Sequence, residues 1–256
     1  MAPAWYALPS GLLGCRDDDG ATAGADAGEP ERQVRAQRTR RGLLLAAARC
    51  LSERGYHATT LRDVLETAGV TKGALYFHFS SKLELARELT CEASRTWLAA
   101  LADIDERGLD PLQVLLVQTD AALVRWNHDV VFRGALRAIS DAPELAEVRR
   151  RWYSGWEART QALLTAALDQ GLLVPGTDTA DLTRGVLALV AGHQALCEVT
   201  STTEECHIRM STSWERLFES AATAGWLAEW RASGWHTREL PDGAALAEED
   251  LAPASS

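Results

Sequence analysis

Apolar residues recur at helical spacing through most of the chain, and this pattern restricts the fold more than any other feature of the sequence. In the first such segment Leu43, Ala46 and Ala47 follow the i, i+3, i+4 rule, which places them on one face of a helix. Thr39 precedes them as a residue type that caps helices, and Gly55 follows as one that ends them. No stretch shows the sustained alternation of apolar and polar residues that a half-buried strand needs. The sequence therefore predicts an all-α fold.

Cap and stop residues divide the rest of the chain into further helices. Thr59 or Thr60 can cap a short helix that Gly69 closes, and Thr71 can cap the next one. The pair Asp110–Pro111 places a capping residue before a proline, which is a strong start signal. The expected helices after the first are a short segment that ends before Gly69 and the segments 72–78, 82–103, 111–126, 129–139, 143–170, 179–199, 205–222 and 225–233.

The two ends of the chain lack this periodicity. Residues 1–30 are rich in Ala, Gly, Asp and Pro, and we expect them to form a disordered leader; a native start near Val34 is the alternative. Residues 236–256 are acidic and rich in alanine, and we expect a disordered tail there.

Charge is distributed unevenly along the chain. The formal net charge is −10, which argues against a protein that is covered by nucleic acid over its whole surface. Residues 31–82, however, hold ten Arg or Lys and only four Asp or Glu, so this segment carries +6 and the remainder −16. A basic segment on an acidic body is typical of a protein with one polyanion-binding end.

Several classes of protein are excluded or disfavoured by missing signals. The sequence contains no stretch of 18 uncharged apolar residues, so it predicts no transmembrane helix. The first residues lack the basic region of a secretory signal. The five cysteines have no metal-ligand or CxxC spacing, so we expect small, reduced, incidental side chains and a cytoplasmic setting, with no metal site and no cofactor. No GxSxG, HExxH or Walker motif is present, and the six histidines have no ligand spacing; we predict no catalytic residue.

The stretch GVTKGALYFHF at residues 69–79 carries the most functional information. It joins two short helices by a glycine-containing turn of about three residues, which is the helix-turn-helix arrangement. In that arrangement the second helix enters the DNA major groove with its N-terminal residues against the base edges. Leu75 and Phe79 are four residues apart and are expected to face inward, where they would hold this helix on its partners.

The other residues of this helix suit contact with DNA. A bare backbone at Gly73 permits close approach, although glycine is poor helix material, and Lys72 can reach a guanine edge or a phosphate. Thr71 and the free N–H groups of the first turn favour a phosphate oxygen. Tyr76 and His78 can donate hydrogen bonds to flanking phosphates, which fix the register without reading sequence.

The segment TTLRDVLETAGVTKGALYFHFSSKLELA at residues 59–86 closely resembles the DNA-binding domain of TetR-type transcriptional repressors. The resemblance implies an N-terminal helix-turn-helix domain (31–80) and a larger helical ligand-binding and dimerisation domain (81–235). It also implies double-stranded operator DNA as a partner. By this resemblance the positions that touch DNA are Thr60, Lys72, Gly73, Tyr76, His78 and Lys82, and an arginine-rich arm with Arg35, Arg38, Arg40 and Arg41 would follow the backbone or enter a minor groove.

Other segments resemble one branch of this family, the γ-butyrolactone receptors of actinobacteria. They are RQVRAQRTRRGLLLAAARCL, DVVFRGALRAISD, WEARTQALLTAALDQG and SWERLFESAATAGWLAEW. Trp156 matches the tryptophan that lies against the ligand in this branch, and an indole ring suits a small lactone or a flat polycyclic compound. The other expected ligand-binding residues are Trp126, Val130, Phe132, Trp152, Ala191 and His193, although a structural role for His193 is also open.

Two positions depart from this branch. Ala93 and Ala191 stand where its members offer a glutamine and a threonine to the lactone. A polar ligand group that is buried without a partner costs a few kcal/mol, so an antibiotic or a biosynthetic intermediate is as good a candidate effector as a butyrolactone.

The later helices suggest a homodimer. Gly185, Ala188, Gly192 and Ala195 would let helix 179–199 approach another helix closely. Together with the helix that carries Ile208, Trp214, Leu217 and Phe218 they predict a four-helix seam between two subunits; an intramolecular buried helix is the alternative. The resulting hypothesis is a homodimeric, effector-responsive repressor, and the alternatives are a ligand-independent DNA-binding protein and, less well supported, an enzyme of small-molecule metabolism.

Overall fold

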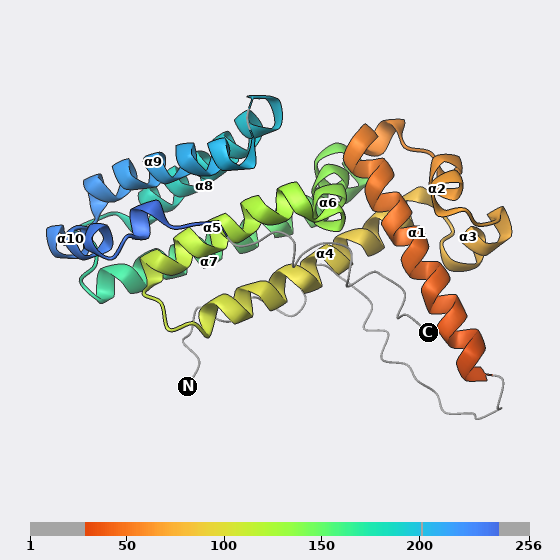
Figure 1. The fold of residues 1–256 in the computed structure, drawn as a ribbon, viewed down its shortest axis with the longest axis horizontal. Coiled ribbons are helices and arrows are strands. Elements are labelled where there is room, and N and C mark those ends of the chain that lie inside the picture. The colour runs from red at the N-terminus through yellow and green to blue at the C-terminus, as the bar shows by residue number, and fades with distance from the viewer. Residues whose placement is uncertain (1–28, 201, 241–256) are drawn as a thin grey trace. The chain divides into compact units, whose positions relative to one another are not determined.

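Helices account for nearly all of the chain that the structure describes. The structure is a computed structural model, and it describes residues 29–200 and 202–240. Its α-helices are α1 (Glu29–Ala58), α2 (Leu61–Ala68), α3 (Lys72–His78), α4 (Lys82–Asp105), α5 (Pro111–His128), α6 (Val130–Asp141), α7 (Ala146–Asp169), α8 (Thr179–Thr200), α9 (Thr203–Ala221) and α10 (Ala224–Ala232). Short 3-10 turns cover Pro143–Leu145 and Trp235–Thr237, and an isolated bridge between Leu173 and Ala222 is the only β pairing within the described ranges. The all-α prediction is confirmed (Figure 1).

The described residues divide into two compact units. One, which we call the head unit, contains residues 29–97 and 128–151; the other, which we call the body unit, contains 98–127, 152–200 and 202–240. Helices α4 and α7 contribute to both. Compact units need not coincide with functional domains, so the domain limits given above stay a prediction.

The head unit is built on a single apolar core. Helices α2, α3 and α6 all pack against α1, and Figure 1 shows α2 and α3 beside it. The core takes leucines from α1, α3 and α4 that are almost completely buried: Leu43, Leu51, Leu75, Leu85 and Leu89. Each such side chain contributes about 1.5–3 kcal/mol when it leaves water. Short helices such as α2 and α3 are marginal alone, so this burial is what holds them.

Helix α1 begins earlier than the sequence predicted. Thr39 is not its cap: the Thr39 hydroxyl donates to the Arg35 carbonyl oxygen at 3.0 Å, one turn back within the helix. Residues 31–41 are mostly Glu, Arg, Gln and Ala, which are good helix formers, so no signal stops the helix from extending toward the N-terminus. The predicted arginine-rich arm is therefore helical, and the end of the predicted leader, residues 29 and 30, belongs to α1. Residues 1–28 lie outside the described part of the chain.

The body unit has an aromatic core near its C-terminal end. Trp214 and Phe218 of α9 stack with ring centroids 5.3 Å apart, and Trp226 and Trp230 of α10 surround them. Trp214 is 0% exposed and Phe218 2%. These two side chains therefore face the interior of their own unit and do not contribute to the seam predicted for the helix that carries them; the seam itself stays a prediction.

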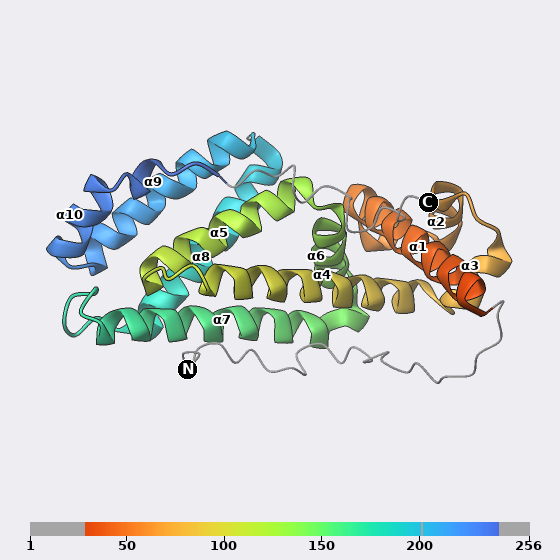
Figure 2. The same ribbon diagram turned by 60° about the horizontal axis from the view of Figure 1, so that its bottom comes forward.

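Helices α8 and α9 lie side by side in the body unit and are covalently joined (Figures 1 and 2). A disulfide links Cys197 near the end of α8 to Cys206 in the first turns of α9. The expectation that all cysteines are reduced and incidental is wrong for this pair and for Cys91, which is also disulfide-bonded. Nothing in the spacing of nine residues between Cys197 and Cys206 identified them as a bridge. Cys50 is a free, buried cysteine in the head unit, as expected.

The ordered chain also extends past the predicted start of the tail. Arg238 donates to both carboxylate oxygens of Asp120 in α5, at 2.5 and 2.8 Å, and its side chain is only 10% exposed. Residues 241–256 lie outside the described part of the chain. Within the described residues, no helix combines the length and the apolar character that crossing a membrane requires.

Candidate nucleic-acid interface

Helices α2 and α3 form the predicted helix-turn-helix. Thr60 caps α2, and Gly69 ends it in the left-handed conformation with φ 65°, so both expectations are confirmed. Three residues later α3 begins, with the Thr71 hydroxyl accepting a hydrogen bond from the Ala74 N–H at 3.3 Å. The bounds of α3, Lys72–His78, are those that the sequence predicted.

The inner face of α3 anchors it to the head unit. Leu75 is 0% exposed and Phe79, which caps the C-terminus of α3, is 2% exposed, as their spacing predicted. The Arg40 guanidinium of α1 lies 5.6 Å from the centroid of the Phe79 ring, so α1 covers this end of the helix. The opposite face of α3 is exposed and is therefore accessible to a binding partner.

Four side-chain positions make up the outer face of α3: Lys72, Gly73, Tyr76 and Phe77. All are exposed. Lys72 and Tyr76 are four residues apart, as are Gly73 and Phe77, so the two pairs lie on adjoining strips of the helix surface. The Lys72 ammonium is 5.7 Å from the centroid of the Tyr76 ring, a cation–π distance.

Gly73 has no structural reason inside the chain to be glycine. Its backbone is not in the left-handed region, and a Cβ atom placed on it would meet nothing within 4 Å. Alanine would favour the helix by up to about 1 kcal/mol. A bare position with open space in front of it, on the exposed face of a short basic helix, is what close backbone approach to DNA requires.

His78 is the last residue of α3 and is half-buried. Burial lowers the pKa of its imidazole, and the nearby Arg40 charge lowers the pKa further. The ring is therefore neutral at pH 7, and it can offer one N–H to a phosphate oxygen rather than a positive charge.

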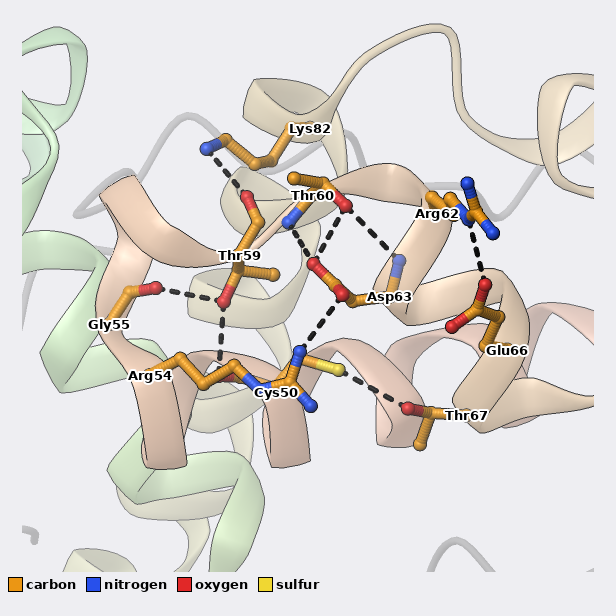
Figure 3. Close-up of polar contacts among 10 residues, drawn as sticks. All are labelled: Cys50, Arg54, Gly55, Thr59, Thr60, Arg62, Asp63, Glu66, Thr67 and Lys82. Atoms are coloured by element: carbon orange, nitrogen blue, oxygen red, sulfur yellow. Dashed lines mark hydrogen bonds and ion pairs between the residues drawn. The ribbon is translucent and has the colours of Figure 1, made fainter.

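Thr60 and the start of α2 are part of a polar network that Figure 3 shows. The Thr60 hydroxyl donates to Asp63 Oδ2 at 2.7 Å, and the same carboxylate pairs with Arg54 of α1 at 2.9 Å. The two hydrogen bonds from Thr60 are the main reason why the pKa of Asp63 is lowered. Because the Thr60 proton is committed to Asp63, a phosphate contact there would fall to another donor or need a rearrangement; its role stays a prediction.

Two of the three remaining predicted DNA contacts, Arg40 and Lys82, pair with groups of the head unit. Arg40 pairs with Glu88 of α4 at 2.7 Å. The Lys82 ammonium donates to the carbonyl oxygens of Tyr56 at 2.7 Å and Thr59 at 2.9 Å, so two of its three protons are used. Figure 3 shows the contact with Thr59. Arg38 is exposed on α1.

Sequence reasoning missed Phe77 as a functional residue. It is 79% exposed, the most exposed of the large apolar side chains in the described ranges, and it shares the outer strip of α3 with Gly73. An exposed phenylalanine costs solvation free energy unless something covers it, and an aromatic ring can pack on a thymine methyl group in the major groove. Its position directly between Tyr76 and His78, two residues predicted to contact DNA, was the available signal.

We expect Phe77→Ala to separate binding from folding. Surface substitutions change the free energy of unfolding by less than about 0.5 kcal/mol, so the thermal midpoint should stay close to that of the wild type. Loss of an aromatic contact of about 1 kcal/mol should weaken operator binding about fivefold in a fluorescence-anisotropy titration. Tyr153→Ala is the matched control, because Tyr153 is 51% exposed on α7 and should leave operator affinity unchanged. Equal affinities for the two variants would remove Phe77 from the interface.

The predicted effector residues are distributed over both units. In the head unit Val130 is half-buried at the start of α6, and Phe132 is 3% exposed with its ring 5.7 Å from that of Trp97. In the body unit Trp152 and Trp156 are half-buried four residues apart on α7, and Trp126 is half-buried near the end of α5.

The two remaining predicted effector residues lie on α8. Ala191 is exposed. The His193 Nε2 atom lies 2.8 Å from the Ser213 hydroxyl of α9, and burial lowers the pKa of the His193 imidazole, as does Arg209. This contact supports the structural alternative for His193, while its ligand role stays a prediction.

Comparison with known proteins agrees with this geometry. A family model for bacterial regulatory proteins of the tetR family matches residues 43–89, which run from α1 into α4. Full-length native TylP, a TetR regulator from Streptomyces fradiae, is 33% identical over 76% of this chain and 92% of that one, with a TM-score of 0.60.

Two further solved structures are similar over most of the chain. A γ-butyrolactone receptor (ArpA-like protein) is 28% identical, over 78% of this chain and 95% of that one, with a TM-score of 0.63. CprB from Streptomyces coelicolor, solved in complex with its biological operator sequence, is 26% identical, over 79% of this chain and 98% of that one, with a TM-score of 0.63. With an exposed, basic recognition helix on a helical body, the chain belongs to the TetR family, and it is a DNA-binding transcriptional regulator that resembles the γ-butyrolactone receptors.

Proposed function

We propose that the chain is an effector-responsive repressor that binds a near-palindromic operator as a homodimer and leaves it when a small hydrophobic molecule binds. The observation that supports this most is the outer face of α3, where a glycine without an intramolecular purpose lies among exposed Lys72, Tyr76 and Phe77. The family consists of transcriptional regulators and not of enzymes. We propose a cytoplasmic location, because the chromosomal DNA that it would bind lies there.

An exposed stripe on α8 supports the homodimer. Four small residues at spacings of three and four are exposed there: Gly185, Ala188, Gly192 and Ala195. Leu196 on α8 is 60% exposed and Ile208 on the neighbouring α9 is 58% exposed, which are unusual values for branched apolar side chains. A second copy that covers this surface would give two recognition helices for two operator half-sites.

The proposed effector is a γ-butyrolactone or an antibiotic or biosynthetic intermediate, and the regulated genes are those of secondary metabolism, including antibiotic biosynthesis. Support comes from the similarity to a γ-butyrolactone receptor and from the pair Trp152 and Trp156 on one face of α7. Ala93, where the branch has a glutamine, is 2% exposed and apolar, so it offers no hydrogen bond to a lactone. This favours an effector with fewer polar groups at that point.

Two substitutions test the proposal by affecting different steps. Lys72→Ala should reduce operator affinity, because it removes a phosphate or guanine contact, and should reduce the magnitude of the slope of log K against log salt by about one.

Trp156→Ala should leave operator affinity intact and reduce the release from the operator that a synthetic γ-butyrolactone or an extract of the source culture causes. A mobility shift on the DNA that flanks its own gene measures both. Release that survives Trp156→Ala places the effector elsewhere; a wild type that no compound or extract releases supports the ligand-independent alternative.

A further inference from the structure

Tyr56 lies at the corner where the chain turns from α1 into α2. The helical path of α1 is interrupted at Gly55, which has φ 76° and ψ 171°. Tyr56 itself is 5% exposed. The buried Thr59 hydroxyl stabilises this corner, because it lies within hydrogen-bond distance of two carbonyl oxygens of α1: that of Gly55 at 2.8 Å and that of Cys50 at 3.0 Å (Figure 3). The direction in which α2 and α3 leave α1 is set at this corner.

Two charged side chains from two other helices hold the backbone of Tyr56, one on each side of its Cα atom. Its N–H donates to Asp141 Oδ2, at the end of α6, over 3.0 Å. Its carbonyl oxygen accepts from the Lys82 ammonium, at the start of α4, over 2.7 Å, and the ammonium lies 4.2 Å from the centroid of the Tyr56 ring. Hydrogen bonds with one charged partner are about twice as strong as neutral ones. We call this arrangement of Asp141, Tyr56 and Lys82 the corner clamp.

Two glycines allow α6 to lie close to α1 near the clamp. A Cβ atom at position 55 would lie 2.6 Å from Asp141 Oδ2, so glycine is needed there for the carboxylate to approach as well as for its positive φ. Helix α6 makes a second close contact at Gly134, where a Cβ atom would lie 2.6 Å from the Ala48 carbonyl oxygen of α1. Helix α6 is thus fixed to α1 at two points, one of them backbone against backbone.

The end of α6 that carries Asp141 is itself anchored. Arg149 of α7 donates to the carbonyl oxygens of Ser140 at 3.0 Å and Ile139 at 3.4 Å, which are among the unpaired acceptors at a helix C-terminus. Asp141 therefore lies at the anchored end of a rod of about 18 Å. The other end of that rod carries Val130 and Phe132, two of the proposed effector residues.

We propose that Asp141 and Lys82 are positioning residues for operator recognition: together they fix the direction of α2 and α3 by holding the backbone N–H and the backbone carbonyl of Tyr56. This inference rests on the proposed function. It also gives Lys82, which the family resemblance assigned to DNA, a different principal role.

The first experiment removes one hydrogen bond at the clamp. Asp141→Ala leaves the Tyr56 N–H without its acceptor, whereas Asp141→Asn keeps an oxygen there; Asp103→Ala, at an exposed position of α4 in the body unit, is the matched control. Operator affinity is measured by anisotropy at a temperature where circular dichroism shows each variant fully folded. Asp141→Ala should weaken binding about tenfold, Asp141→Asn less than about threefold, and Asp103→Ala not at all.

The second experiment distinguishes positioning from direct contact at Lys82. Removal of a lysine that neutralises one phosphate reduces the magnitude of the slope of log K against log salt by about one. Lys82→Met should therefore weaken operator binding with the salt slope unchanged, whereas Lys72→Ala should reduce the slope. This comparison also decides the matter if Asp141→Ala does not fold.

The outcomes separate the clamp from the proposed function. A wild type that binds no operator contradicts the proposed function itself. A wild type that binds, with Asp141→Ala equal to it or with Lys82→Met lowering the salt slope as Lys72→Ala does, overturns the clamp and leaves the proposed function standing.

Discussion

Replacing Gly73 with alanine should stabilise the protein and at the same time weaken its binding to the operator. Alanine at an exposed helical position with an ordinary backbone conformation should raise the free energy of unfolding by up to about 1 kcal/mol, since the added methyl group meets nothing within 4 Å. On DNA the same methyl group would lie between the α3 backbone and the base edges. We expect operator affinity to fall at least about tenfold, which corresponds to about 1.4 kcal/mol.

The opposite signs make this test specific. Urea unfolding gives the stability change, and an anisotropy titration gives the affinity change. Gly225→Ala is the control, because Gly225 is also exposed in a helix, α10, with open space in front of it. It should leave operator affinity unchanged. A Gly73→Ala variant that binds as tightly as the wild type would show that α3 does not approach DNA closely at this position.

The largest expected loss of stability comes from a buried ion pair in the body unit. The Arg159 guanidinium of α7 donates to both carboxylate oxygens of Asp105 at 2.7 and 3.1 Å and to Gln118 Oε1 at 2.8 Å. Both charged side chains are 4% exposed. Arg159→Met would leave the Asp105 carboxylate buried without its partner, so the free energy of unfolding should fall by about 3–5 kcal/mol.

A double variant shows whether the pair or the lost partner matters. Arg159→Met combined with Asp105→Leu removes both charges, and it should recover much of the stability because a buried pair contributes little compared with apolar residues of similar volume. Arg184→Met is the control, since Arg184 pairs with Asp181 on an exposed surface and should cost less than about 1 kcal/mol. Urea unfolding measures all three. A loss below about 1 kcal/mol for Arg159→Met would mean that water reaches Asp105.

Most of the fold could be read from the sequence because its helix ends are marked by local chemistry. Thr60, Thr71 and Asp110 each accept hydrogen bonds from the first turn of the helix that the sequence assigned to them. Gly55 and Gly69 both adopt the positive φ values that a stop signal implies. These signals depend on neighbours within four residues, so they need no knowledge of the tertiary structure.

The start of α1 shows where local signals mislead. Thr39 is a good capping residue, but it is also tolerated inside a helix when its hydroxyl bonds to the carbonyl oxygen four residues back, as it does to Arg35. The helix-forming residues before Thr39 contain no signal that would begin a helix there. The choice between the two structures is therefore made by the flanking residues and not by Thr39.

Other differences arise from contacts distant in sequence. Trp214 and Phe218 have the periodicity of any amphipathic helix, and only the presence of Trp226 and Trp230 shows that their face is covered within the body unit. The pairing of Arg238 with Asp120 joins positions 118 residues apart, and no pattern near Arg238 predicts it. For the interface, the inner face of α3 was predicted correctly, while the exposure of Phe77 and the partners of Lys82 required the structure.

The central claim is that the outer face of α3 binds a specific duplex near the chain's own gene. The direct test is an anisotropy titration of the purified wild type with labelled duplexes that tile the flanking DNA, repeated between about 50 mM and about 200 mM salt. The account predicts one duplex bound with a dissociation constant of about 10⁻⁸ M or tighter, at least about 10³-fold more tightly than its neighbours, with affinity that falls steeply as salt rises. Uniform weak binding to every duplex, or none at the lowest salt, would contradict it.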